Sequence, residues 1–289
     1  MKIIKSDRKV VTRSPQRKVG YINCRWFQHE RIEHESLLEK RFVQCALLCP
    51  RLKHIKSQPF KIQISRKSTY TPDFLLTFED GTKLVVEVKI HSKVARYGEK
   101  FRIAQNILKA GNRDFFVLTE LDIDRFRQSV IAAEILRYGK SEFDVALLRT
   151  VMDAMADQAE KNIVIKELAQ LCDCSNEVIF HLIAKRQLTL HVDDYLNADA
   201  RVYIAQLHEG PDTHVFTQHF EVKPWVAQEN IMSAPLVRAQ GLRMRVKRAN
   251  LPYVRAKMVK HNQPIPHPLS SLAGGLPQTI KARRPGSAG

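Results

Sequence analysis

The stretch from Tyr70 to Ile90 constrains the fold most strongly, because it reads as two strands joined by a tight turn. Residues 70–78 and 83–90 are rich in β-forming residues, and Asp80-Gly81 lies between them. A two-residue loop would place Asp73 opposite Val88, with its carboxylate on the wrong face. A three-residue loop over 79–81, with Gly81 left-handed in a bulge, sets Asp73 opposite Glu87, and this register is predicted.

Glu87 and Lys89 lie two apart in the second strand, so they share one face while Val86 and Val88 point into the core. Opposed carboxylates of Asp73 and Glu87 would have Cβ atoms about 5 Å apart, which is destabilising unless they are neutralised. A hard divalent cation relieves this repulsion, and Mg²⁺ typically takes one or two carboxylates together with water and phosphate oxygens. The pattern therefore predicts a site for a metal and a phosphate.

Glu39 supplies a third carboxylate. A helix is predicted over residues 33–49, and Glu39 lies in an otherwise apolar row with Phe42, Val43 and Ala46. A carboxylate in such a stripe is costly unless it is paired, so a metal or a basic partner is predicted for it. Glu35, one turn earlier, is the reserve candidate.

These residues suggest a definite chemistry. A metal held by Asp73 and Glu87 would polarise a phosphate oxygen and lower the pKa of a water that attacks the phosphorus in line. Lys89 would orient that water or stabilise charge on the phosphorus, and Glu39 would bind the same or a second metal. The alternative is a solvated ion pair, since one charged face is normal in an antiparallel sheet. The ordered combination of an inward Glu, a Pro-Asp strand and an apolar Glu-x-Lys strand favours the chemistry.

The remaining pattern predicts an α/β fold with a mixed sheet flanked by helices over residues 21–140. Short strands are expected at 18–22 and 25–27, and residues 60–64, 70–78 and 83–90 should form a three-stranded antiparallel meander. A helix at 99–110, a buried strand at 115–119, and a helix capped by Asp122 or Asp124 and ended by Gly139 complete this domain.

Residues 141–208 are expected to form a small winged helix-turn-helix domain. Helices are predicted near 142–156, 165–171 and 176–186, followed by a hairpin over 188–204 with its turn at 197–199. Lys185 and Arg186 on the third helix are candidate contacts to DNA or to a protein partner, and both alternatives stay open. Residues 209–289 are expected to be a basic, largely irregular tail.

The net charge of +17 comes from the two ends of the chain. Residues 1–20 form a basic arm of +6, and residues 230–289 carry +11 and no acid, so the segment between them is neutral. The densest basic run of the tail holds Arg243, Arg245, Lys247 and Arg248. Charge confined to such arms favours contact with double-stranded nucleic acid over a membrane surface or an acidic protein.

The sequence has neither an apolar stretch long enough to span a membrane nor a signal-peptide pattern at its start, which predicts a cytoplasmic protein. Its five cysteines lack the spacing of a zinc site and are expected to be reduced thiols.

At Pro72-Asp73 and Glu87-Val88-Lys89 the chain resembles the PD-(D/E)XK nuclease superfamily. More narrowly, it resembles the TnsA family, the endonuclease subunits of heteromeric cut-and-paste transposons. The segments that carry this resemblance are Glu35-Ser-Leu-Leu-Glu39-Lys-Arg-Phe, Ser57-Gln-Pro-Phe, Tyr70-Thr-Pro-Asp-Phe and Val86-Glu-Val-Lys.

The resemblance implies a restriction-endonuclease-like fold and Mg²⁺ or Mn²⁺ bound by Glu39, Asp73, Glu87 and the backbone carbonyl of Val88, with Lys89 completing the catalytic set. It also implies cleavage at the 5′ ends of a transposon, joint action with a TnsB-like transposase and contact with a TnsC-like ATPase. The main alternative is a restriction or repair nuclease of the same superfamily that cuts DNA alone. A non-catalytic DNA-binding protein with a decayed nuclease fold is disfavoured, because all four residues are intact.

Overall fold

The computed structural model describes residues 3–5, 18–190, 197–205 and 211–226 of the chain. These residues all belong to one unit that spans residues 1–234. The tail residues Arg243, Arg245, Lys247 and Arg248 lie outside the described residues, as does most of the basic N-terminal arm.

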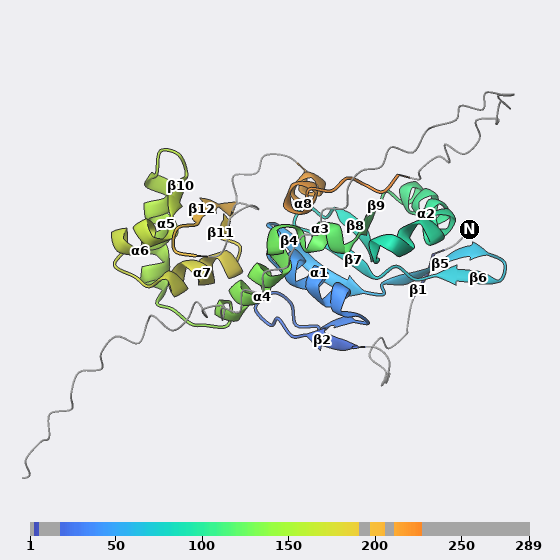
Figure 1. Cartoon of the computed structure of the whole chain (residues 1–289), viewed down its shortest axis with the longest axis horizontal. Coiled ribbons are helices and arrows are strands. Elements are labelled where there is room, and N and C mark those ends of the chain that lie inside the picture. Colours follow the sequence, from blue (N-terminus) through green and yellow to red (C-terminus); the bar gives the residue numbers. More distant parts are fainter. Residues whose placement is uncertain (1–2, 6–17, 191–196, 206–210, 227–289) are drawn as a thin grey trace, which may run out of the picture. The chain divides into compact units, whose positions relative to one another are not determined.

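A four-stranded mixed sheet forms the centre of the fold (Figure 1). Its strands run in the order β4 (Leu52–Ser57), β7 (Phe74–Phe78), β8 (Lys83–Val88) and β9 (Asp114–Leu118). The first three are antiparallel, whereas β9 is parallel to β8. The predicted mixed sheet flanked by helices is therefore present, and β9 is the expected buried apolar strand.

The β7–β8 hairpin has the register that the sequence predicts. Phe74 pairs with Val86 and Thr77 with Lys83, which leaves residues 79–81 as a three-residue loop. The loop closes through the Phe78 N–H, which donates to the Thr82 carbonyl at 3.0 Å, and Gly81 has a φ of 85°. This left-handed backbone is the conformation for which glycine is needed in such a loop. Continuing the register by one residue sets Asp73 at the level of Glu87.

The predicted three-stranded meander is wrong in one respect, because β5 (Phe60–Ser65) does not pair with β7. The neighbour of β7 is β4, a strand that the sequence analysis did not identify. Instead, β5 pairs with β6 (Ser68–Tyr70) and with β1 (Ile3–Lys5) in a second sheet of order β1-β5-β6. The expected strand over 70–78 is broken after Tyr70, since Pro72 has no N–H to donate to a ladder.

Helices cover both faces of the central sheet. On one face, α1 (Leu37–Leu47) packs Phe42 against Phe74 at 5.2 Å between ring centroids, within a core that also contains Val86. On the other face, α2 (His91–Ala110) packs Phe101 against Phe115. Both faces of the β8 strand are consequently buried, which explains its nearly continuous apolar sequence.

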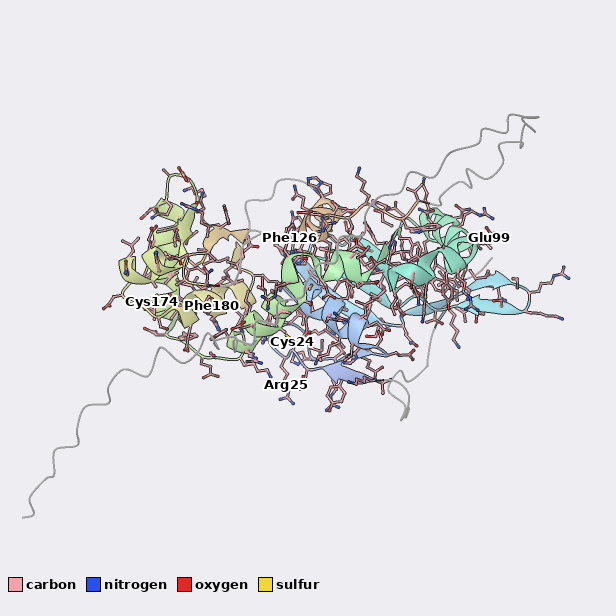
Figure 2. All side chains as sticks on the ribbon, viewed as in Figure 1. Cys24, Arg25, Glu99, Phe126, Cys174 and Phe180 are labelled. Carbon is pink, nitrogen blue, oxygen red and sulfur yellow. The ribbon has the colours of Figure 1, made fainter. Side chains whose placement is uncertain are left out.

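Several boundaries near these helices differ from the prediction. Residues 25–27 form a turn rather than a strand, and β2 (Gly20–Ile22) pairs with β3 (Ile32–His34) just before α1. The α2 helix begins at His91, well before residue 99. The single helix expected up to residue 137 is divided into α3 (Glu120–Ile123), the 3₁₀ turn η1 (Arg125–Arg127) and α4 (Gln128–Tyr138). The division falls at Phe126, labelled in Figure 2, where φ is 48°.

The next part of the chain contains three helices and three short strands. They are α5 (Val145–Asp157), β10 (Asn162–Val164), α6 (Ile165–Leu171), α7 (Asn176–Ala184), β11 (Leu188–Leu190) and β12 (Arg201–Ile204). The strands β11 and β12 are antiparallel, as expected for the hairpin, and its intervening residues 191–196 lie outside the described residues. The winged-helix interpretation of this region stays a prediction.

The helix α8 (Asp212–Phe220) was not expected in the tail. Phe216 and Phe220 are fully buried in the same core as Phe42, and Phe220 stacks on that ring at 5.6 Å. At its start, the buried Asp212 carboxylate accepts a hydrogen bond from the Asp80 N–H and pairs with Arg51 at 2.6 Å. This helix therefore packs on the central sheet and contacts the β7–β8 loop.

All five cysteines are free thiols, as predicted, and none of the described ones forms a disulfide. Among the helices in the described part of the chain, none is long and apolar enough to cross a lipid bilayer.

The Asp212 contacts give a stability prediction. Asp212→Ala should lower the free energy of unfolding by about 1–3 kcal/mol, because it leaves the Asp80 N–H and the Arg51 guanidinium without their buried acceptor. Urea unfolding followed by circular dichroism measures the change. Asp157→Ala, at an exposed position, should change it by less than about 0.5 kcal/mol. Equal effects of the two substitutions would contradict the role given to Asp212.

Candidate active site

An open cleft of about 650 Å³ lies where α1 begins and β8 ends. Its lining includes three of the four predicted catalytic residues, namely Glu39, Asp73 and Lys89. Val88, Glu35, Arg41, Lys93 and Glu120 line it as well. The fourth predicted residue, Glu87, is buried beside Lys89, with a relative exposure of only 3%. The structure thus brings all four residues into one neighbourhood.

Asp73 is held in place by the backbone of the neighbouring strand. Its Oδ2 accepts a hydrogen bond from the Val88 N–H at 2.8 Å, and its own carbonyl accepts one from the Gln58 N–H at 2.7 Å. Burial raises the pKa of Asp73 well above its ordinary value, and the charges of Glu87 and Glu39 raise it further. The charges of Glu87 and Glu39 thus act in the same direction as burial.

Glu87 has a partner for each of its two oxygens. The Tyr70 hydroxyl donates to Oε2 at 2.7 Å, while the Lys89 ammonium lies 2.8 Å from Oε1. Tyr70 is a residue that the sequence analysis did not select. It stands three positions before Asp73 in the Tyr-Thr-Pro-Asp segment, so its place in that segment was the available signal.

Lys89 is protonated in this environment. Burial disfavours its charged form, but the carboxylates of Glu87 and Asp73 outweigh that effect and raise the pKa of Lys89. Its Nζ also lies over the ring of Tyr97, 5.3 Å from the centroid. Both roles predicted for Lys89, orienting the attacking water and stabilising charge on the phosphorus, suit an ammonium that donates hydrogen bonds.

Glu39 has a structural function that the sequence analysis did not recognise. The Ser36 hydroxyl caps α1 by accepting from the Glu39 N–H at 3.1 Å. In return, Glu39 accepts from the Ser36 hydroxyl at 2.9 Å and from the Glu35 N–H at 2.6 Å. This arrangement resembles a capping box, whose Ser-x-x-Glu spacing was the available signal, but the Glu39 carboxylate accepts from the N–H of Glu35 and not from that of the N-cap residue Ser36. Burial raises the pKa of Glu39, although these hydrogen bonds oppose the rise.

The donor set of this site fits a hard divalent cation. In the described part of the chain, no three His, Cys, Asp or Glu side chains are already arranged around a single metal position. Mg²⁺ does not need such a cage, since one or two carboxylates with water and phosphate oxygens suffice. Asp73 and Glu87 supply two carboxylates of this kind, whose mutual repulsion a cation would relieve. The Val88 carbonyl stays a predicted ligand.

The predicted contact residues Lys185 and Arg186 lie just after α7, which ends at Ala184, and both have partners within the described residues. The Lys185 ammonium lies 5.0 Å from the Trp26 ring centroid, and the Arg186 guanidinium lies 5.0 Å from that of Phe27. Arg186 also donates to the Leu52 carbonyl at the start of β4. Both side chains therefore contact the region around the central sheet, and their role toward DNA or a partner stays a prediction.

A mixed sheet flanked by helices, with carboxylates and a lysine at the ends of two central strands, defines a nuclease-like α/β fold. Residues 49–120 match the family model described as TnsA-like endonuclease N terminal, so this stretch is similar to the N-terminal domain of TnsA-like endonucleases. The matched range contains Asp73, Glu87 and Lys89 but not Glu39. No curated protein matches the chain.

The two roles of Glu39 can be separated by substitution. Glu39→Gln keeps one hydrogen-bond acceptor near the N-terminus of α1 but removes the charge, whereas Glu39→Ala removes both. We expect both variants to lose nuclease activity, and only the alanine variant to lose stability, by about 1 kcal/mol. Cleavage and thermal unfolding assays check this prediction.

Glu35→Gln is the matched control, because it neutralises the neighbouring carboxylate that lines the same cleft. If Glu39→Gln cleaves DNA as well as the wild type does, Glu39 has only its structural role at the start of α1. Loss of cleavage in Glu35→Gln alone would transfer the catalytic role to Glu35.

Proposed function

We propose that this protein is a metal-dependent DNA endonuclease that cuts the 5′ ends of a transposon together with a TnsB-like transposase. The observation that carries the proposal is the convergence of Asp73, Glu87 and Lys89 beside an open cleft, within the segment that matches the TnsA-like model. A surface ion pair would not need a buried Glu87 or an Asp73 fixed by a backbone N–H.

In the proposed reaction, Asp73 and Glu87 hold Mg²⁺ or Mn²⁺. The bound cation would supply polarisation of a phosphate oxygen and acidification of the attacking water. Lys89 would donate its N–H groups to the phosphate as negative charge develops on it. The Val88 N–H fixes the orientation of Asp73, so this carboxylate needs little rearrangement. Glu39 would act at the rim of the same site.

The cleft would suit an anionic substrate with a divalent cation in place. Arg41, Lys89 and Lys93 line it beside the four carboxylates of Glu35, Glu39, Asp73 and Glu120, and Arg41 also pairs with Asp124. A bound cation would offset these acids and leave the basic side chains to meet a DNA phosphate. The basic arms at residues 1–20 and 230–289 would add affinity that does not depend on the DNA sequence.

The proposed partners follow from the family and from the rest of the chain. The match to a TnsA-like model supports action with a TnsB-like transposase and contact with a TnsC-like ATPase. In the region proposed as a winged helix, six of the nine α7 residues are buried. A helix so covered has little free surface for a DNA groove, and Lys185 and Arg186 already contact Trp26 and Phe27, which disfavours base readout by this helix.

A cleavage assay tests this proposal. Purified protein is incubated with labelled transposon-end DNA and Mg²⁺ or Mn²⁺, with and without the transposase. Asp73→Ala should reduce cleavage by more than about 100-fold, because even outer residues around a metal are worth 10–100-fold. Asp114→Ala removes an exposed carboxylate at the opposite end of the β8–β9 pair and should cleave normally.

Two outcomes of this cleavage assay would contradict the proposal. Cleavage that survives Asp73→Ala would remove the active-site assignment. Efficient cutting of unrelated DNA without the transposase would favour a restriction or repair nuclease that acts alone.

A further inference from the structure

The hydroxyl of Tyr70 is a polar group inside an otherwise apolar cluster. The Tyr70 side chain has a relative exposure of 6% and is surrounded by Phe101, Phe115 and Val85 in the core beneath α2. Its ring lies 6.2 Å from that of Phe101 and meets the ring of Phe115 edge to face at 6.5 Å. Phenylalanine would fill this space equally well, so packing does not explain why the residue carries a hydroxyl.

Within the described residues, the one side-chain hydrogen-bond partner of this hydroxyl is Glu87. The hydroxyl has one proton to donate, and Oε2 of Glu87 receives it at 2.7 Å. A hydrogen bond to an ionised carboxylate is roughly twice as strong as one between neutral groups. It therefore holds Oε2 of a buried carboxylate whose other oxygen is paired with Lys89.

Tyr70 reaches Glu87 from a different sheet. It ends β6 and pairs with Ile62 of β5, whereas Glu87 belongs to β8 of the central sheet. The ring contacts with α2 and β9 hold the phenol between the two sheets. The position of its hydroxyl thus depends on three elements packed together and does not follow from a mobile side chain.

We propose that Tyr70 is a positioning residue, which anchors Oε2 of Glu87 and leaves Oε1, the oxygen beside Lys89, to act in the cleft. This inference rests on the proposed function, because it assigns Oε1 as the oxygen that meets a divalent cation. The two oxygens of Glu87 then differ in function. Oε2 would stay bonded to the Tyr70 hydroxyl, while Oε1 would leave the Lys89 ammonium and bind the cation.

Tyr70→Phe is the direct test, since it removes the hydroxyl and keeps the ring in its aromatic cluster. Manganese binding to the full chain without DNA should weaken about 10- to 100-fold, as measured by titration calorimetry with MnCl₂. Cleavage at low Mn²⁺ should fall by a similar factor and recover at high Mn²⁺, while the KM for DNA stays the same. A purely structural role would not produce this dependence on metal concentration.

Tyr138→Phe is the matched control, because Tyr138 packs its ring against Phe180 on α7, away from the cleft-lining residues. It should bind Mn²⁺ and cleave as the wild type does. Wild-type metal affinity in Tyr70→Phe would overturn the positioning role while leaving the proposed function intact. A wild-type chain that binds no Mn²⁺ and cuts no DNA would contradict the proposed function and this inference together.

Discussion

The register between β7 and β8 is the constraint on which the proposed site depends. The three-residue loop with a left-handed Gly81 fixes that register at one end of the hairpin. At the other end, the hydrogen bond from the Val88 N–H to Asp73 closes it just beyond the last paired residues. A shift by one residue would turn every side chain of one strand to the opposite face and separate Asp73 from Glu87. The geometry of the loop at one end of the hairpin therefore determines whether Asp73 and Glu87 meet at the other end.

Three carboxylates close together are costly, and the fold offsets that cost with partners of its own. Asp73 accepts from a backbone N–H, Glu87 contacts Tyr70 and Lys89, and Glu39 completes a helix cap. Each of these contacts fixes the orientation of a carboxylate and also lowers the free energy of burying it. In the proposed reaction, a cation would replace the Lys89 contact and leave the anchoring hydrogen bonds in place. Groups of the fold itself thus hold these carboxylates in place.

The sequence predicted the parts of the fold that depend on local pattern. The β7–β8 register followed from alternation and from Gly81, and the parallel strand β9 followed from its apolar run. The strand β4 was missed because its sequence, Leu-Lys-His-Ile-Lys-Ser, alternates poorly. The helix α8 was missed because Phe216 and Phe220 are buried only against distant α1 and the sheet. Tyr70 needed tertiary structure too, since its partner Glu87 lies in another sheet.

The most direct test of the central claim is a crystal structure of the protein with Mn²⁺, with the metal located by its anomalous scattering. The account predicts a peak about 2 Å from oxygens of both Asp73 and Glu87, with the Tyr70 hydroxyl still bonded to Glu87. A manganese peak coordinated only by other residues, with Glu87 still paired to Lys89, would contradict it.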